Sequence, residues 1–345
     1  MTSIAVQSAV DRGLAFLAQR QLPSGQIATY MGPDLPAGEM VFDSSPFTTA
    51  LVVNSLGAAD APVARELIDR ALAFLLAEME PAGVWRYWTS EHPGHLSIPP
   101  DVDDTACVSH ALRRNRVAFT DNRGVLLANR DGRGLFYTWF TARFTPPPLN
   151  SEFWRVAGRR LATPLRSRRF WRDNGLSPRD VSCVVNANVL FYLGDGPAAQ
   201  PVKEYLVALV RERREGCCDQ WYDSEFPFYY AVSRCMHAGI GGLDEIRDAT
   251  IERIGAAANA DGSIGASALD TAFAACALRF LGDSGTTFER AAGYLVGTQG
   301  VDGGWPIAPL YHGGPPMKLR WGSEELTTGF CLEALLPLDD ERPAR

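Results

Sequence analysis

Six segments of this chain are apolar on nearly all sides, and they align with one another as an internal repeat. They span 45–56, 103–112, 180–193, 224–237, 269–278 and 323–335. One column of the alignment holds a small residue in all six: Ala50, Ala106, Ala187, Ala231, Ala272 and Gly329. The column before it reads Thr49, Thr105, Asn186, Tyr230, Thr271 and Thr328. Any alanine-rich helical protein offers some such columns, but small residues in register are what converging helices need where they approach most closely.

More polar segments alternate with the buried ones, and their apolar residues recur at helical spacing, as in 4–19 and 62–78. One such partner for each buried segment gives about twelve helices, and no run of alternating residues indicates a strand. The pattern predicts an all-α fold: a single α/α toroid (α6/α6 barrel) with six inner helices, six outer helices and a central cavity. A length of 345 residues would suggest two domains. The repeat favours one, over 1–345.

Turns of glycine and aromatic residues separate the repeats. The clearest is the segment 299–305, QGVDGGW, and weaker versions occur at 21–25, 82–85, 129–132 and 259–262. Glycine ends a helix in a left-handed cap. The glutamine and tryptophan side chains can then tie the turn to neighbouring helices, so we expect these turns to be structural.

Charge and cysteine content exclude several classes of protein. The net charge is −7, and a general nucleic-acid binder needs clustered cations instead, so we expect no nucleic-acid partner. No apolar run reaches the length of a membrane-spanning helix, and no secretory signal is visible. The 7 cysteines are scattered without a C-x-x-C pair, which predicts neither a disulfide framework nor a zinc site. We expect a cytoplasmic protein with reduced thiols.

Three carboxylates stand where the second buried helix begins, in the segment 99–106, PPDVDDTA. Proline excludes helix upstream, which places Asp101, Asp103 and Asp104 on the loop and first turn. They could simply cap the helix and complement its dipole. Paired carboxylates could also bind Mg²⁺. The third interpretation is acid catalysis, because three crowded carboxyls at the mouth of an apolar cavity cannot all ionise, and the one that keeps its proton can protonate an alkene.

The segment 101–106, DVDDTA, resembles the D-V-D-D-T-A signature of squalene–hopene cyclase and, more broadly, the D-x-D-D of class II terpene cyclases. The turn at 299–305 is similar to the glutamine–tryptophan motif of that family, and 129–137, NRDGRGLFY, is placed like another copy. The segment 184–190, VVNANVL, aligns with the region that carries a histidine bonded to the acid in squalene–hopene cyclase. Here that position is Asn188, and plant-type diterpene cyclases also use asparagine near their acid. In length the chain is similar to the monodomain bacterial cyclases that make meroterpenoids.

The resemblance implies a role for each matched residue. Asp103 is the expected general acid, which delivers its proton to a terminal alkene of a linear polyprenyl chain. Asp101 and Asp104 are expected to position and polarise it. Asn188 is expected to donate a hydrogen bond to Asp103. The resulting tertiary cation would be attacked by successive alkenes to form fused rings, an isomerisation that uses no cofactor.

A carbocation needs stabilisation without a nucleophile, which aromatic faces supply. Aromatic residues make up 10% of the chain, and core packing is the more common role for any one of them. As a set, the candidates for the substrate-binding wall are Trp85, Tyr87, Phe136, Tyr137, Trp139, Phe226, Tyr230, Phe273, Tyr311 and Trp321.

Seven arginines crowd the segment 155–172. They could form a solvated helix face, an anion site for the polar head of the substrate, or a peripheral contact with anionic lipid. No D-D-x-x-D motif is present, which argues against ionising an allylic diphosphate, and we expect no metal. The resemblance to the meroterpenoid cyclases implies that the substrate is a prenyl chain attached to an aromatic or other polar head. The alternatives are a class II cyclase of a free prenyl diphosphate and a non-catalytic isoprenoid-binding toroid.

Overall fold

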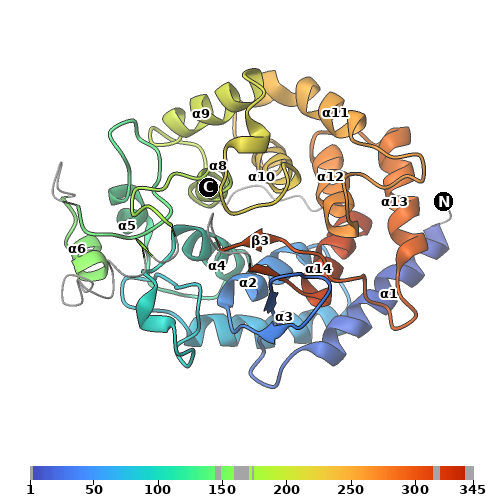
Figure 1. Ribbon diagram of the computed structural model, residues 1–345, viewed down its shortest axis with the longest axis horizontal. Coiled ribbons are helices and arrows are strands. Elements are labelled where there is room, and N and C mark those ends of the chain that lie inside the picture. Colours follow the sequence, from blue (N-terminus) through green and yellow to red (C-terminus); the bar gives the residue numbers. More distant parts are fainter. Residues whose placement is uncertain (1–2, 144–148, 159–170, 173–174, 314–318, 339–345) are drawn as a thin grey trace.

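A computed structural model describes residues 3–143, 149–158, 171–172, 175–313 and 319–338, and it is mostly helical (Figure 1). Six of its helices coincide with the six segments of the repeat: α2 (Pro46–Ser55), α4 (Val102–Arg114), α8 (Cys183–Leu193), α10 (Phe226–His237), α12 (Ala268–Phe280) and α14 (Glu324–Leu335). The other α-helices in the described part are α1 (Ser3–Arg20), α3 (Pro62–Ala77), α5 (Arg123–Ala128), α6 (Ser151–Ala157), α9 (Gln200–Arg211), α11 (Arg247–Ala256) and α13 (Thr286–Thr298).

The six repeat helices are arranged in a ring. Each contacts the next one in chain order, and α14 contacts α2, which closes the cycle. Figure 1 shows α1, α3, α9, α11 and α13 around the outside of this ring. The helical class is confirmed. Two complete rings of six stay a prediction, because the chain between α6 and α8 lies partly outside the described residues.

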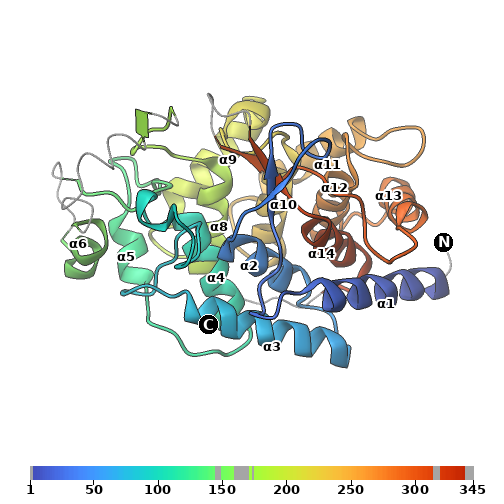
Figure 2. The ribbon, with the colours of Figure 1, turned by 60° about the horizontal axis from the view of Figure 1, so that its bottom comes forward.

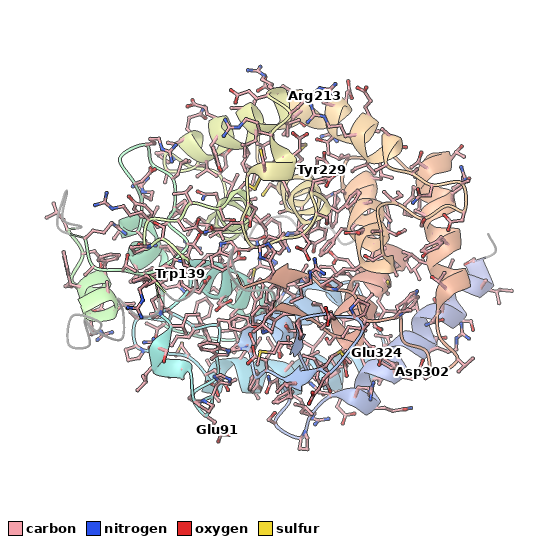
Figure 3. All side chains as sticks on the ribbon, in the orientation of Figure 1. Glu91, Trp139, Arg213, Tyr229, Asp302 and Glu324 are labelled. Carbon is pink, nitrogen blue, oxygen red and sulfur yellow. A yellow bond between two sulfur atoms is a disulfide. The ribbon has the colours of Figure 1, made fainter. Side chains whose placement is uncertain are left out.

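Side chains from the repeat helices fill the middle of the ring (Figure 3). The small-residue column is buried: Ala50, Ala187 and Ala272 are each 0% exposed. A Cβ atom placed on Gly329 would come within 3.1 Å of the side chain of Val52 on α2. The column therefore marks where neighbouring repeat helices approach most closely, as its sequence pattern predicts.

The glycine-aromatic turns are structural, as expected. The indole nitrogens of Trp85 and Trp305 each donate to a helix carbonyl at 2.8 Å, on Leu75 and Leu295.

The residues that precede the small residue in the repeat share a structural role. In five of the six repeats the side chain of this residue accepts a hydrogen bond from a backbone N–H of the preceding turn; the acceptors are Thr49, Thr105, Asn186, Thr271 and Thr328.

A small antiparallel sheet corrects the all-α prediction. Its strands are β1 (Tyr30–Gly32), β2 (Val41–Phe42), β3 (Tyr311–His312) and β4 (Arg320–Gly322), in the order β2-β1-β4-β3. Figure 2 shows this sheet at one end of the helices, where it joins an early and a late part of the chain. The sequence could not reveal it, because alternation cannot be detected in strands of two or three residues.

A disulfide between Cys183 and Cys218 corrects the expectation of reduced thiols. The two cysteines are 35 residues apart, and spacing alone does not give connectivity. The bond ties the start of α8 to the segment that precedes α10. No helix in the described part of the chain combines the length and the apolar character that crossing a membrane requires.

Candidate active site

The acidic loop is built around Asp101. This residue is extended and caps α4, because its Oδ1 accepts hydrogen bonds from the backbone N–H groups of Asp103 at 2.6 Å and Asp104 at 3.2 Å. Its own N–H donates to the carbonyl of Trp85. The capping interpretation is therefore correct for Asp101, which holds the next two acids in place.

Asp103 is the acid with the most partners. Its Oδ1 accepts from Nδ2 of Asn188 at 2.8 Å, and its Oδ2 accepts from the hydroxyl of Tyr222 at 3.2 Å. The expected contact with Asn188 is thus present. Burial raises the pKa of Asp103 to about 6, and the hydrogen bonds and the charge of Arg234 keep it from rising further.

Asp104 lies on the same turn and has fewer partners. Its Oδ2 is buried and has no hydrogen-bond partner among the described residues. Burial, followed by the charge of Asp101, raises the pKa of Asp104 well above its ordinary value. Burial and the charge of Asp103 do the same for the pKa of Asp101. Burial and mutual repulsion thus favour the protonated forms of these carboxyls, and Asp103 is the one that hydrogen-bond donors and the charge of Arg234 hold back.

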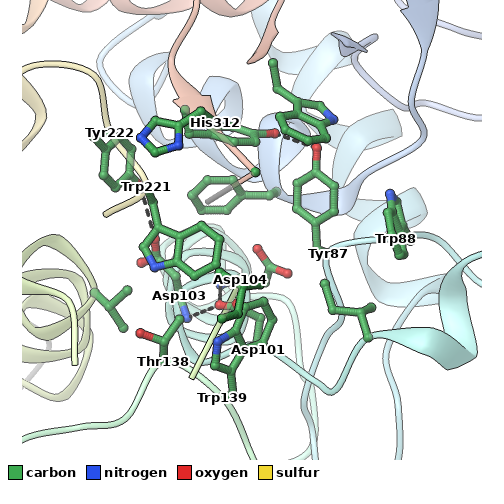
Figure 4. Close-up of a pocket in the computed structure, with 17 residues that line it drawn as sticks. Tyr87, Trp88, Asp101, Asp103, Asp104, Thr138, Trp139, Trp221, Tyr222 and His312 are labelled. Carbon is green, nitrogen blue, oxygen red and sulfur yellow. Dashed lines mark hydrogen bonds between the residues drawn. The ribbon is translucent and has the colours of Figure 1, made fainter. Parts of the chain in front are cut away.

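The three acids form part of the wall of a cavity, which the close-up in Figure 4 shows with its aromatic side chains. The cavity has an empty volume of about 770 Å³, which includes the solvent at its open mouth. Besides the acids, it is lined by Phe47, Tyr87, Trp88, Ile98, Thr138, Trp139, Leu176, Val185, Trp221, Tyr222, Tyr311, His312, Gly313 and Trp321.

Of the aromatic candidates, four line this cavity: Tyr87, Trp139, Tyr311 and Trp321. Tyr230 and Phe273 line a second cavity among the repeat helices, with an empty volume of about 310 Å³ that includes open solvent. Tyr222 lines both cavities.

The other four aromatic candidates line neither of these two cavities, which corrects their assignment. Trp85 is fully buried in its turn, and the backbone N–H of Phe136 donates to Asn186. Tyr137 stacks under the guanidinium of Arg143, and Phe226 packs edge-on against Tyr229. All four belong to turns or helix packing, the common role of aromatic residues.

Sequence reasoning missed Trp221 and Tyr222, which stand side by side before α10. Trp221 donates from Nε1 to Asp180 at 3.0 Å, and its ring packs edge-on against Trp139. The signal was their position: the segment before a repeat helix also carries Trp85 and Phe136.

One buried carboxylate, Asp43, holds much of the opposite wall. It is 1% exposed and accepts hydrogen bonds from Nε1 of Trp88 at 3.0 Å and Nε1 of Trp321 at 2.6 Å. The hydroxyl of Tyr87 donates to it at 3.3 Å. Tyr87 in turn shares a hydrogen bond of 2.8 Å with the hydroxyl of Tyr311. This network fixes the orientation of four aromatic side chains.

Two further expectations concern ions. No group of His, Cys, Asp and Glu side chains in the described ranges could hold a metal ion. Most of the arginine-rich segment lies outside the described residues. Of its arginines, Arg155 is described and forms an exposed ion pair with Glu152, so the anion-site interpretation stays a prediction.

Comparison with known proteins gives a fold. No protein-family model matches the chain, and a search of curated proteins finds no match. Among solved structures, an arginine-to-alanine variant of the type II terpene cyclase MstE from Scytonema, in complex with geranylgeranyl dihydroxybenzoate as substrate, matches with a TM-score of 0.71. The identity is 13%, and the match covers 97% of each chain.

Two other solved structures have a similar fold. An aspartate-to-alanine variant of MstE, in complex with merosterolic acid A as product, matches with a TM-score of 0.69 at 14% identity over 96% of each chain. A protein from Actinoplanes matches with a TM-score of 0.71 at 20% identity, over 96% of this chain and 98% of that one. Over nearly its whole length, this chain therefore has the fold of the type II terpene cyclase MstE.

Proposed function

We propose that this protein is a class II terpene cyclase, an isomerase that folds as one α/α toroid over the whole chain. The observation that carries the proposal is a cluster of three buried carboxyls in the wall of an aromatic cavity, with Asp103 held by Asn188 and Tyr222. The fold shared with MstE supports it.

In the first step, the proton on Oδ2 of Asp103 moves to the terminal alkene of the substrate. The O–H bond breaks, a C–H bond forms, and a tertiary cation results. When substrate fills the cavity and displaces water, the pKa of Asp103 should rise above about 6, which favours the protonated acid that this step requires.

In the following steps, each alkene donates its electron pair to the cation and forms a carbon–carbon bond. The last cation loses a proton to solvent, and solvent returns a proton to the carboxylate of Asp103, so the product is an isomer of the substrate and no electrons are exchanged with a cofactor. The rings of Tyr87, Trp139, Trp221, Tyr311 and Trp321 line the path. Each aromatic face stabilises a nearby cation by about 0.5–2 kcal/mol.

The substrate we propose is a linear polyprenyl chain attached to an aromatic, polar head. The bound ligand of MstE, geranylgeranyl dihydroxybenzoate, is of this class, and the open mouth of the cavity would leave room for such a head. A free prenyl diphosphate is the alternative substrate.

The test is the mass of the product. The purified protein is incubated with geranylgeranyl dihydroxybenzoate and, separately, with geranylgeranyl diphosphate, each with and without Mg²⁺. We expect an isomer from the aromatic substrate that Asp103→Asn does not form. An isomer from the diphosphate alone would change the assigned head group, whereas tight binding without any isomer would make the protein a non-catalytic isoprenoid binder.

A further inference from the structure

The fourth repeat helix, α10, departs from the pattern of the other five. Where they carry a threonine or asparagine that accepts a hydrogen bond from the preceding turn, α10 carries Tyr230. Its hydroxyl instead donates to the carboxylate of Glu333 on α14, at 2.9 and 3.1 Å to the two oxygens. The helix therefore presents polar groups to the interior of the ring where the other repeats bind their turns.

One helical turn after Tyr230, the same face of α10 carries Arg234, which is 5% exposed. Its guanidinium donates to Oδ1 of Asn188 at 2.8 Å and to the hydroxyl of Tyr230 at 3.4 Å. It also stacks over the ring of Phe191, with 4.1 Å between its Cζ and the ring centroid. A side chain held from several directions has little freedom to turn.

The guanidinium of Arg234 fixes the orientation of the Asn188 amide, because it can only donate hydrogen bonds. An asparagine amide offers an acceptor at one end and a donor at the other, and a guanidinium can only donate. Oδ1 of Asn188 must therefore face Arg234, and Nδ2 must face Oδ1 of Asp103. Because Nδ2 donates, Oδ1 of Asp103 cannot carry the proton at the same time.

We infer that Arg234 is a positioning residue: by fixing the amide of Asn188, it keeps the acidic proton of Asp103 on Oδ2. That oxygen faces Tyr222, which lines both cavities. The consequence for turnover rests on the proposed cyclase function. The orientation of the Asn188 amide does not depend on that function.

Besides its hydrogen bond to Asn188, Arg234 acts on Asp103 through its positive charge. It lowers the pKa of Asp103 against the effect of burial, and a stronger acid transfers its proton more readily. Other titratable groups face Asp103 or Arg234 and stay in place in every variant below; they are Asp101, Asp104, Cys107, Asp219, Tyr222, Tyr230, Cys235 and Cys276. Behind them, Asp180 acts on Asp101, and Glu333 acts on Tyr230 and Cys276.

The first experiment needs no substrate. The protonated carboxyl of Asp103 is titrated by infrared difference spectroscopy, with Asp103→Asn as the reference that lacks its band. We expect a midpoint near pH 6 in the parent, a higher midpoint in Arg234→Ala and Arg234→Gln, and a return toward the parent value in Arg234→Lys, which keeps a donor-only cation. If Arg234→Ala does not fold, Arg234→Gln preserves the volume and still tests the inference.

The matched control is Arg113→Ala. Arg113 is also partly buried, lies on the same helix as Asp103, and stacks over the ring of Tyr192. Its loss should lower stability without moving the titration. An unchanged midpoint in both neutral variants of Arg234, or an equal shift in Arg113→Ala, would overturn the inference.

The second experiment measures turnover against pH. We expect Arg234→Ala to lower kcat by about 10–100-fold, the usual effect of a residue that orients a reacting group, with a small change in KM. Added guanidinium should restore part of the rate, because Arg234 lines the second cavity and its truncation leaves space there. In the double variant with Asn188→Ala, the losses should not multiply, because both residues act through one hydrogen bond. Full multiplication would contradict this arrangement.

Absence of turnover in the parent would reject the proposed function, while the infrared titration would still decide the role of Arg234.

Discussion

Replacing the proposed acid should stabilise the protein at neutral pH while it abolishes cyclisation. Asp103 is buried, and its pKa rises from 3.8 in an exposed aspartate to about 6. A pKa raised in the folded state means that the protonated form folds more favourably. That advantage is complete below pH 4 and is lost as the pH passes through 6. Above pH 6, folding carries the cost of burying a carboxylate.

The magnitude follows from the size of the shift. A rise of about two units corresponds to about 3 kcal/mol at 1.4 kcal/mol per unit. Asp103→Asn removes this cost, since asparagine is neutral at every pH and nearly isosteric. It can still accept from Asn188 through Oδ1 and donate to the hydroxyl of Tyr222 through Nδ2. For 345 residues, a gain of about 3 kcal/mol corresponds to a rise in Tm of about 4 °C.

The assay is urea unfolding of the parent and of Asp103→Asn between pH 4 and pH 8, with Asp60→Asn as a control. Asp60 is a surface carboxylate whose side chain is 95% exposed. We expect the stability difference to be small at pH 4, to grow as the pH rises through 6, and to level off by pH 8. A difference independent of pH, or an Asn variant less stable than the parent at pH 8, would refute the assignment of a raised pKa to Asp103.

Four other substitutions give distinct outcomes. Tyr222→Phe removes a hydroxyl that donates to Asp103; its loss raises the pKa of the acid, so the pH–rate profile should move to higher pH and kcat should fall about tenfold, near one charged hydrogen bond. Trp139→Leu removes an aromatic face from the cavity and should yield incompletely cyclised products by chromatography, at a cost of about 0.5–2 kcal/mol in cation stabilisation. Trp85→Phe, outside the cavity, should lose about 1 kcal/mol of stability and keep the same products; equal product mixtures from the two tryptophan variants would contradict their separation. Asp43→Asn leaves indole donors without a carboxylate, and we expect a loss of about 1–3 kcal/mol in chemical denaturation together with a higher KM.

Much of the helical framework could be predicted from local sequence. Five of the six repeat helices combine an apolar run with a start signal: Ser45, Asp101, Ser182, Ser267 and Ser323 cap the helices that follow them. These signals act within three or four residues, so they do not depend on the rest of the fold. The four short strands and the disulfide depend on segments far apart in the chain, and no local pattern revealed them.

The residues of the candidate site could likewise be predicted only in part. The motif and the resemblance predicted the three acids and Asn188 as site residues, and the structure places Asn188 in contact with Asp103. The aromatic wall was predicted in part, because a tryptophan before a repeat helix can point into its turn, as Trp85 does, or into the cavity, as Trp221 does. Residue type is the same in both cases. The direction of the side chain depends on packing against neighbouring helices.

By itself, the sequence determined which helices form, that they repeat, and that three carboxyls stand at the start of one of them. Only the tertiary structure decided which hydrogen-bond donors surround each carboxyl. Asp103 receives hydrogen bonds from Asn188, 85 residues away, and from Tyr222, 119 residues away, while Asp104 has a buried oxygen without a partner among the described residues. The three side chains are chemically identical. Their pKa values differ because burial and neighbouring donors set the free energy of each carboxylate, and those donors meet only when the ring of helices closes.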